Sequence, residues 1–361
     1  MSFDSGDGSN SPENGGQYTE GKAKIEHLSN LKISGPGSKS SGFLNSSQLL
    51  NRDITVMLLN TLRPKLYLDG FSATGIRAIR ANLEADIRTV AVERNYRTYQ
   101  ILLSNLQENN VTAETYMDSF ESVVSRFRFD FIDVDPYGSI VPYVDTALNY
   151  STNNGYIGFT ATDLSVLTGS IEEKNMRRYG SRMPNNSMRH EFGLRNLLGF
   201  IARRAASLDM GIIPEISFWH GHYYRVILKV KHGANAACAT LDGVGTISPS
   251  AVDPLLQSSS YGPLWTGSMN SIFHDSTLNI PDSIGEISRN FAISLVNEDI
   301  SALFLDATES MSRRKINLPS ISDVISEAEG VGIVARRTHF STTGIKSNNY
   351  GELLKIMAKS P

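Results

Sequence analysis

Residues 212–230, IIPEISFWHGHYYRVILKV, settle which kind of sheet this chain builds. The two halves, 212–219 and 223–230, read as apolar strands, and only the short turn from His220 to His222 separates them. Two strands joined so closely must run antiparallel. The chain therefore ends its sheet-forming region with an antiparallel hairpin.

Upstream of this hairpin, short apolar strands alternate with stretches whose apolar residues have helical spacing. Strands separated by about 10 to 15 helical residues indicate a parallel sheet with helices on both faces. A parallel alternation closed by an antiparallel hairpin is typical of a class I methyltransferase and unusual for a dehydrogenase. We therefore expect an α/β, Rossmann-like class I methyltransferase fold with a seven-stranded sheet and an antiparallel last strand. The expected strands are 65–70, 87–93, 113–118, 129–135, 155–163, 212–219 and 223–230, and the expected helices are 43–63, 74–85, 95–109 and 191–208.

The length of 361 residues suits two domains rather than one. The first twenty residues hold four acids and no Lys or Arg in a run rich in Ser, Gly and Asn, which predicts disorder. Residues 232–251 are poor in charge and rich in Gly, Ala and Ser, which indicates a domain boundary. We expect a disordered tail at 1–19, a methyltransferase domain at 20–235 and a smaller α+β C-terminal domain at 236–361, with helices at 283–308 and 319–329 and a strand at 331–335.

Composition excludes several classes of protein. A single cysteine, Cys238, rules out an intramolecular disulfide and a four-cysteine zinc site and favours a reducing compartment. No stretch approaches the roughly 18 apolar residues that span a bilayer, and the N-terminus lacks a signal pattern, so we expect a cytoplasmic protein. The net charge of −3 argues against a uniformly basic nucleic-acid binder. Residues 174–231 nevertheless hold eleven Lys or Arg against three acids, which suits either a polyanion-binding surface or a solvated helix face.

Small and polar residues follow the first strand, where a parallel sheet binds its ligands. The loop DGFSATG contributes four residues that we expect to border a nucleoside cofactor: Asp69, Gly70, Thr74 and Gly75. The two glycines let the backbone approach a ligand closely, and Thr74 can cap the following helix. A tight strand-to-helix turn without a ligand explains the loop nearly as well.

Acids stand at the ends of the next two strands. Glu93 ends the second strand, where an acid accepts hydrogen bonds from both ribose hydroxyls of an adenosine. Asp118 ends the third strand, where an acid can reach the exocyclic amine of an adenine. Arg77, after the glycine loop, is either a surface arginine or a partner for an anion such as the carboxylate of a methionine moiety. Since NAD and S-adenosylmethionine both satisfy these contacts, the fourth strand decides between them.

The fourth strand ends in Asp135-Pro136-Tyr137-Gly138, which resembles the Asp-Pro-Pro-Tyr element of methyltransferases that act on exocyclic amines of bases. Such an amine is a poor nucleophile because its lone pair is delocalised into the ring. The Asp135 carboxylate and the Pro136 carbonyl can hold its N–H bonds, and Asp135 can take the proton after transfer. Tyr137 would stack on the flipped base. Asp133, two residues earlier, is assigned no chemistry.

These residues belong to a wider resemblance, to the tRNA (guanine-26-N2)-dimethyltransferase family. It is carried by EGKAKI (20–25), NRD (51–53), DGFSATGIRAIR (69–80), DPYGS (135–139), HEFGLR (190–195), YYRVILKV (223–230), GPLWTG (262–267) and RTHFSTTGIK (337–346). It implies transfer of one or two methyl groups from S-adenosylmethionine to N2 of guanine 26 in tRNA, and a family-specific, tRNA-binding C-terminal domain. It also implies that Asp135 is the catalytic carboxylate and that the cofactor is bound by Arg52, Arg77, Glu93, Asp118 and Ser119.

The chain departs from the family pattern at two points. Some relatives carry a zinc-binding cysteine cluster just after the catalytic domain, where this chain has GTISPSAVD (245–253), so we expect no metal. Tyr137 stands where many relatives are expected to have Phe. Arg52 has a second interpretation, as the partner of Asp53.

Other functions stay open. An enzyme that methylates an amine of another RNA or DNA base fits the same site. An RNA-binding protein on a methyltransferase fold is the non-enzymatic alternative, although intact Asp135, Tyr137 and Glu93 argue against it. The pair His190 and Glu191 is either an acid-base or metal site or a helix-start and packing feature. No protein partner is implied, and the candidate tRNA phosphate contacts are the basic clusters at 177–178, 203–204, 313–315 and 336–337.

Overall fold

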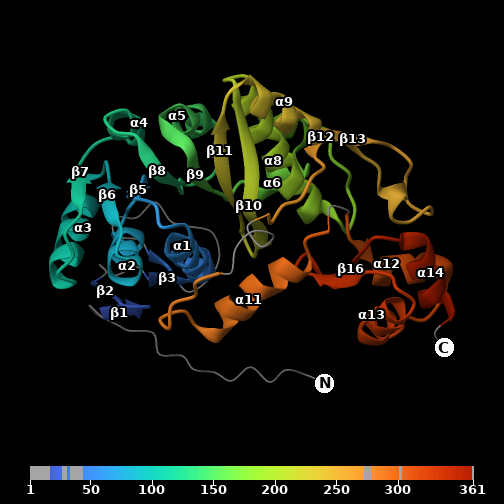
Figure 1. The fold of residues 1–361 in the computed structure, drawn as a ribbon. Helices are drawn as coiled ribbons and strands as arrows, with labels where there is room; N and C mark the ends of the chain where they lie inside the picture. The colour runs from blue at the N-terminus through green and yellow to red at the C-terminus, as the bar shows by residue number, and fades with distance from the viewer. Residues whose placement is uncertain (1–16, 27–30, 33–43, 272–277, 301–302, 360–361) are drawn as a thin grey trace.

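The computed structural model describes residues 17–26, 31–32, 44–271, 278–300 and 303–359 (Figure 1). The expected disordered tail lies outside these residues except for its last three, which belong to the first strand, β1 (Gln17–Glu20). Among the described helices, none is long and apolar enough to cross a membrane.

A seven-stranded sheet lies at the centre of the molecule, in the order β10-β11-β9-β8-β5-β6-β7 (Figure 1). Strands β5 to β9 pair in parallel, and β11 lies antiparallel between β9 and β10. The expected class I methyltransferase sheet is confirmed, and the hairpin at 212–230 supplies its antiparallel strand. The strands are β5 (Leu66–Asp69), β6 (Arg88–Val92), β7 (Glu114–Tyr116), β8 (Phe129–Val134), β9 (Ser151–Ala161), β10 (Met210–His220) and β11 (Tyr223–His232).

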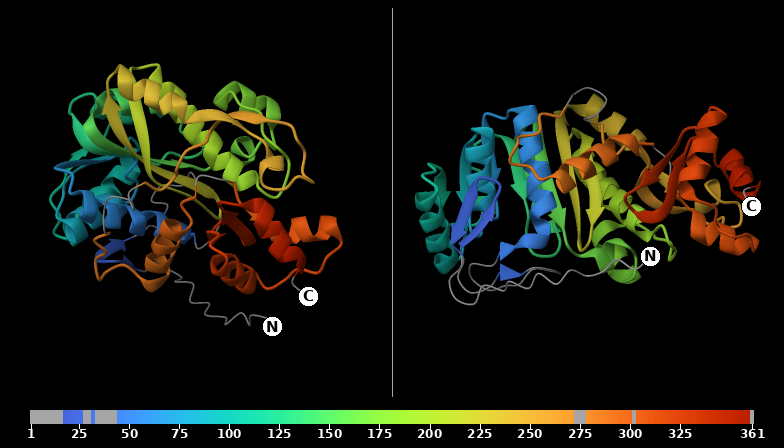
Figure 2. Two further views of the ribbon diagram at one scale, coloured as in Figure 1. Left: turned by 45° about the vertical axis from the view of Figure 1, so that its right-hand side comes forward. Right: turned by 90° about the horizontal axis from the view of Figure 1, so that it is seen from below.

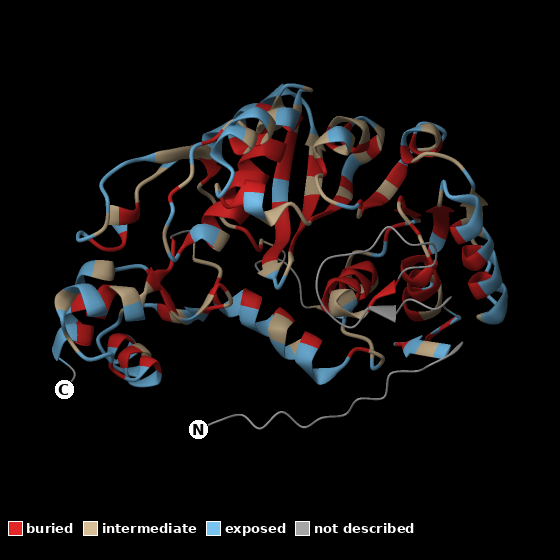
Figure 3. Ribbon diagram, turned by 180° about the vertical axis from the view of Figure 1, so that it is seen from behind, coloured by how far each residue is buried: buried red, intermediate tan, exposed pale blue. Residues whose placement is uncertain are grey.

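Alternate residues of the central strands face opposite sides of the sheet, as pleating requires. Leu68 and Ile132 join the core formed with α5 and α8, whereas Tyr67 and Phe131 join a second core formed with α1. The strands are therefore buried between helix layers (Figure 2 and Figure 3). The helices of this domain are α1 (Leu49–Leu62), α2 (Ile76–Ala85), α3 (Tyr96–Glu108), α4 (Phe120–Val124), α5 (Val144–Tyr150), α6 (Leu164–Leu167), α7 (Glu172–Tyr179) and α8 (Arg189–Ala206).

Short N-terminal strands pack beside this domain. β1 and β2 (Ala23–Glu26) form an antiparallel hairpin, from which Ala23 and Ile25 pack with α2 and α3. β3 (Leu31–Lys32) pairs in parallel with β4 (Leu44–Asn45), and the chain enters α1 a few residues later.

The segment at 232–251, expected to be a boundary, contains a helix, α9 (Ala234–Asp242). Helix α9 packs against β10, where the Thr240 hydroxyl accepts a backbone N–H of the strand at 2.9 Å. A Cβ on Gly211 of β10 would lie 2.3 Å from the carbonyl oxygen of Ala236, so this contact needs a glycine. The alanine-rich sequence of α9, which resembles a linker, thus also suits a helix that packs closely on a strand.

Beyond α9 the chain first follows α8 and then forms a core of its own. β13 packs along α8, while β14, β16 and β15 form a three-stranded sheet whose core includes α12, α13 and α14. Helix α11 lies between α1 and this sheet (Figure 2), and it covers only part of the expected helix 283–308. The bounds are β12 (Val244–Ile247), β13 (Tyr261–Trp265), α11 (Glu286–Asn297), β14 (Leu305–Asp306), α12 (Ala307–Arg314), α13 (Ile321–Gly330), β15 (Ala335–Thr338), β16 (Ser341–Ser347) and α14 (Tyr350–Lys359).

Candidate active site

A cavity of about 590 Å³ opens at the carboxyl ends of the parallel strands. The loops after β5, β6, β7 and β8 line it, together with β4 and the start of α1. Parallel strands bring their carboxyl ends to one edge of a sheet, which is why residues from four loops meet there. Of the predicted site residues, Asp69 and Gly75 are absent from the lining, and those present are Arg52, Gly70, Thr74, Arg77, Glu93, Asp118, Ser119, Asp135, Pro136 and Tyr137.

The two glycines of the first loop are needed for packing within the protein. A Cβ on Gly70 would lie 2.6 Å from the Phe120 ring and 2.8 Å from the carbonyl oxygen of Asp133. Gly75 has a φ of +84°, and a Cβ there would lie 2.4 Å from Leu102 of α3. Gly70 therefore borders the cavity, whereas Gly75 faces a helix.

Two buried oxygens of this loop, Thr74 Oγ1 and Asp69 Oδ2, have no hydrogen-bond partner among the described residues. The expected helix cap by Thr74 is wrong, because Gly75 in the left-handed conformation occupies the N-cap of α2. Thr74 lines the cavity, although its hydroxyl oxygen is itself buried. Burial raises the pKa of Asp69 to about 7, a rise that Arg77 opposes and Asp133 reinforces.

The acids at the next two strand ends line the cavity. Glu93 accepts a backbone N–H of the following loop at 2.7 Å, and its partial burial raises its pKa. Asp118 accepts from the Ser122 hydroxyl at 2.8 Å, from the backbone of Ser119 at 2.7 Å and from Arg126 at 2.6 Å, and these bonds lower its pKa. Since a carboxylate has about four acceptor positions, both acids can accept further bonds from a nucleoside.

One wall of the cavity consists of aromatic side chains that the sequence reasoning missed. Phe71 stacks on Phe120 with ring centroids 5.5 Å apart, and Tyr143 meets Phe71 edge to face at 4.9 Å. All three line the cavity, and such a wall suits a purine ring. A positional signal was available, because Phe71 and Phe120 each lie within two residues of an expected strand end.

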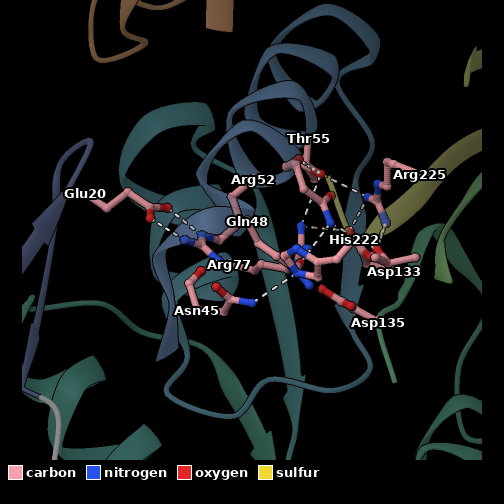
Figure 4. A network of polar contacts seen from close by, with 12 residues as sticks. Glu20, Asn45, Gln48, Arg52, Thr55, Arg77, Asp133, Asp135, His222 and Arg225 are labelled. Carbon is pink, nitrogen blue, oxygen red and sulfur yellow. Dashed lines mark hydrogen bonds and ion pairs between the residues drawn. The ribbon is translucent and has the colours of Figure 1, made fainter. Parts of the chain in front are cut away.

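Arg52 lines the cavity, but its guanidinium is engaged with the N-terminal strands. It bonds the two carboxylate oxygens of Glu20 at 2.6 and 2.5 Å and donates to the carbonyl of Asn45 at 3.0 Å (Figure 4). The alternative pairing of Arg52 with Asp53 is wrong, because Asp53 pairs with Arg80 at 2.7 Å. Arg52 therefore holds β1 and β4 beside α1, and β4 is part of the cavity wall.

Arg77 reaches from α2 to the end of β8. Its Nη2 bonds Asp135 Oδ2 at 2.6 Å, and its Nη1 lies 3.3 Å from Thr55 Oγ1 and 3.7 Å from Asp133 Oδ2 (Figure 4). Burial would lower the pKa of Arg77, but Asp133 and Asp135 raise it above its ordinary value, so the guanidinium is charged. The predicted cofactor arginine and the predicted catalytic carboxylate are direct partners in this structure.

Asp133, to which no chemistry was assigned, lies at the buried centre of this group. Arg225 binds both of its oxygens, with Nη1 to Oδ1 at 2.8 Å and Nη2 to Oδ2 at 2.7 Å (Figure 4). Neither side chain is more than 1% exposed. Burial alone would raise the pKa of Asp133, but Arg225 and Arg77 hold it below its ordinary value. Asp133 is thus an ionised carboxylate inside the protein.

The turn that carries Asp135, Pro136 and Tyr137 is anchored to the end of β9. The Gly138 N–H donates to Thr162 Oγ1 at 2.9 Å, and the Thr162 N–H donates back to the Gly138 carbonyl at 3.0 Å. Tyr137 is 56% exposed at the cavity. Burial and the nearby carboxylate of Asp135 raise the pKa of Tyr137 to about 12, so its hydroxyl is protonated at neutral pH.

A sequence profile of the family described as "N2,N2-dimethylguanosine tRNA methyltransferase" matches residues 21–358. The chain belongs to this family. It is 39% identical over 348 residues to the tRNA (guanine(26)-N(2))-dimethyltransferase of Thermoplasma volcanium, covering 95% of this chain and 99% of the relative. It is 33% identical over 371 residues to the enzyme of the same name from Pyrococcus abyssi, covering 92% of this chain and 95% of the relative.

A solved structure shares the whole architecture. Trm1 from Pyrococcus horikoshii, in complex with S-adenosyl-L-methionine, superposes with a TM-score of 0.81 at 30% identity, covering 95% of this chain and 100% of that one. The N2,N2-dimethylguanosine tRNA methyltransferase fold therefore extends over the C-terminal part of this chain as well as over the sheet.

The HEFGLR motif of this family member is structural around Glu191. Glu191 is fully buried and binds Arg195 at 2.8 Å, Lys346 at 3.2 Å and the backbone N–H of Phe304 at 2.9 Å. The neighbouring His190 stacks on a tryptophan of β10, and burial lowers its pKa to about 4. Within the described part of the chain, no group of three or more His, Cys, Asp or Glu side chains is arranged to hold a metal ion.

Much of the basic charge of this family member is paired within the protein. Two of the eleven cations of 174–231, Arg195 and Arg225, are fully buried. Members of the expected phosphate-binding clusters pair with acids: Arg178 with Asp163, Arg204 with Asp145, Arg313 with Glu309, Arg314 with Asp253 and Arg336 with Glu329. Because exposed ion pairs are weak, those on the surface can still exchange an acid for a phosphate.

Proposed function

We propose that this chain is a tRNA methyltransferase that transfers one or two methyl groups from S-adenosylmethionine to the exocyclic N2 of guanine 26. The observation that carries the proposal is the position of the Asp135-Pro136-Tyr137 turn. It opens into the same cavity as Glu93, Asp118 and Arg77, so a base amine and a nucleoside cofactor can meet there.

The cavity residues fit each part of the cofactor. Glu93 would accept the ribose hydroxyls, Asp118 with Ser119 would bind the adenine edge, and Arg77 would bind the carboxylate of the methionine part. The aromatic wall that holds Phe71 and Phe120 would contact one side of the adenine. S-adenosylmethionine supplies an activated methyl group when it is bound there.

The turn after β8 would prepare the amine for attack. The Asp135 carboxylate and the Pro136 carbonyl would accept its N–H bonds and fix the direction of the nitrogen lone pair. As the nitrogen becomes positive, the negative Asp135 carboxylate would stabilise it, and the same carboxylate would then accept its proton. The Tyr137 ring would stack on the flipped base, and its protonated hydroxyl adds no charge.

The partner in this proposal is tRNA, and part of its binding surface is the C-terminal domain from 236 onward. A cytoplasmic location belongs to the proposal too, since one cysteine fits a reducing compartment. The boundary at 236 stays a prediction. Residue 236 lies within α9, and both α9 and β13 pack on elements of the methyltransferase domain, namely β10 and α8.

The proposal is tested with methyl-labelled S-adenosylmethionine and two unmodified tRNA transcripts that differ only in guanine or adenine at position 26. After digestion to nucleosides, we expect label in N2-methylguanosine and N2,N2-dimethylguanosine from the first transcript and none from the second. Label in any other nucleoside, or equal labelling of both transcripts, would refute the proposal.

A further inference from the structure

We infer that Asp133 and Arg225 are positioning residues, whose buried ion pair fixes the Arg77 guanidinium between the catalytic carboxylate and the carboxylate of the bound cofactor. The inference rests on the proposed function for the roles of Arg77 and Asp135. It adds a second layer behind the cavity, which touches neither substrate.

The pair is built to hold one geometry. Arg225 donates two parallel hydrogen bonds to the Asp133 carboxylate, the arrangement in which a guanidinium and a carboxylate fix each other's plane. The Tyr67 hydroxyl donates to Asp133 Oδ2 at 3.2 Å, and Thr160 Oγ1 accepts from Arg225 Nη1 at 3.1 Å. A Cβ on Gly158 would lie 2.6 Å from the Arg225 guanidinium, so β9 leaves room for this group.

Arg77 is connected to this pair at two points. Thr55 Oγ1 accepts from Arg77 Nη1 at 3.3 Å and from Arg225 Nη2 at 2.9 Å, so one hydroxyl holds both guanidiniums (Figure 4). Asp133 Oδ2 lies 3.7 Å from Arg77 Nη1. The remaining end of the Arg77 fork, Nη2, bonds Asp135 at the cavity. Because the inner end is fixed, the outer end has one position in which to meet a second carboxylate.

This arrangement predicts which measurements depend on the pair. Misplacing Arg77 weakens the contact with the cofactor carboxylate and also turns Asp135 away from the base amine. Cofactor affinity and turnover therefore fall together. Because Asp133 and Arg225 are buried and do not line the cavity, they touch no part of a bound tRNA, and we expect tRNA affinity to be unchanged.

The main test compares the wild-type protein with a D133N/R225Q double variant. The two substitutions remove one negative and one positive charge, so the net charge beside the cavity is unchanged. A changed affinity for the cofactor then reports a displaced Arg77 rather than a changed electrostatic field. Calorimetry measures the Kd for S-adenosylmethionine without any need for turnover, and steady-state assays give kcat and the KM for tRNA. In the folded double variant we expect the Kd for S-adenosylmethionine to rise and kcat to fall, each by roughly 10- to 100-fold. The KM for tRNA should be unchanged.

A milder pair of variants serves if the double variant does not fold. Thr55→Val removes the shared acceptor, and we expect a Kd for S-adenosylmethionine about fivefold weaker. Thr55→Ser keeps the hydroxyl, so its affinity for S-adenosylmethionine should equal that of the wild type. Thr61→Val, on the same helix, is the matched control, because the Thr61 hydroxyl bonds the Met57 carbonyl and the backbone of Asn279 instead.

Two results overturn the inference: a folded D133N/R225Q variant with wild-type Kd and kcat, or Thr55→Val, Thr55→Ser and Thr61→Val proteins of equal cofactor affinity. Failure of the proposed function looks different. The wild-type protein would then place no label on guanine N2, while the calorimetric comparison would still decide whether the buried pair positions Arg77.

Discussion

Asp135 and Arg77 each have a task that depends on the other. A charge-assisted bond of 2.6 Å fixes the orientation of the carboxylate at the cavity. Because a carboxylate has about four acceptor positions, Asp135 can hold an amine N–H while it is bound to Arg77. The pairing therefore orients the proposed catalytic carboxylate without blocking it.

The charge of Asp135 is predicted to matter more than its shape. Asp135→Asn keeps the volume of the side chain but removes the negative charge that, in the proposed mechanism, stabilises the nitrogen as it becomes positive. We expect kcat in single-turnover methyl transfer to fall by roughly 100- to 1,000-fold. Asp130→Asn is the control, since Asp130 lies on β8, the strand that precedes Asp135, and accepts a hydrogen bond from the backbone N–H of Leu66 at the start of β5. A variant within tenfold of wild type would remove Asp135 from the chemistry.

Tyr137 is predicted to act through its ring. Stacking on a base contributes about 1–3 kcal/mol, so Tyr137→Ala should lower kcat/KM for tRNA by roughly 10- to 100-fold. Tyr137→Phe keeps the stacking surface and should retain most of the activity. Equal losses in the two variants would show that the hydroxyl, rather than the ring, carries the contribution.

At the level of helices and strands, the sequence predicts what depends on periodicity and fails where tertiary packing decides. All seven strands of the sheet were predicted, and their carboxyl ends located most of the cavity. The Arg52–Glu20 and Arg77–Asp135 pairs join residues 32 and 58 positions apart, and no local pattern indicates such partners. Helix α9 was missed because alanine and glycine suit a linker and a close helix contact alike.

The N-terminal hairpin provides a prediction about pH. Burial would raise the pKa of Glu20, but Arg52 and Arg80 lower it from 4.5 to about 2. A lowered pKa in the folded state contributes stability above the unfolded value, and this contribution is lost as the pH falls from about 4.5 toward 2. Glu20→Gln should therefore lower the free energy of unfolding by roughly 3 kcal/mol at pH 7 and by less than half as much near pH 3.

Denaturant unfolding of the two proteins at both pH values measures this difference. Glu26→Gln is the control, because Glu26 lies exposed at the far end of β2. A difference between wild type and Glu20→Gln that does not shrink toward pH 3 would contradict the assigned role of the ion pairs.

Across the whole molecule, buried charges join segments that are distant in the sequence. Asp133 on β8 binds Arg225 on β11, and Glu191 on α8 binds Lys346 on β16. The first pair lies beside the cavity, whereas the second connects the methyltransferase sheet region to the C-terminal sheet. The role of Glu191 in the HEFGLR motif is therefore to join the two parts of the molecule. The sequence of the motif alone could not distinguish this structural role from acid-base chemistry.

Glu191 tests that distinction. Glu191→Gln leaves the buried cations of Arg195 and Lys346 without their shared carboxylate, and breaking such a buried pair typically costs about 3–5 kcal/mol of stability. Since Glu191 does not line the described cavity, kcat of the folded variant should equal that of the wild type. Glu173→Gln, in an exposed pair with Arg177, should change neither quantity. Thermal unfolding and turnover measured on the same preparations separate the two roles, because an acid-base function for Glu191 requires kcat to fall in protein that is still folded.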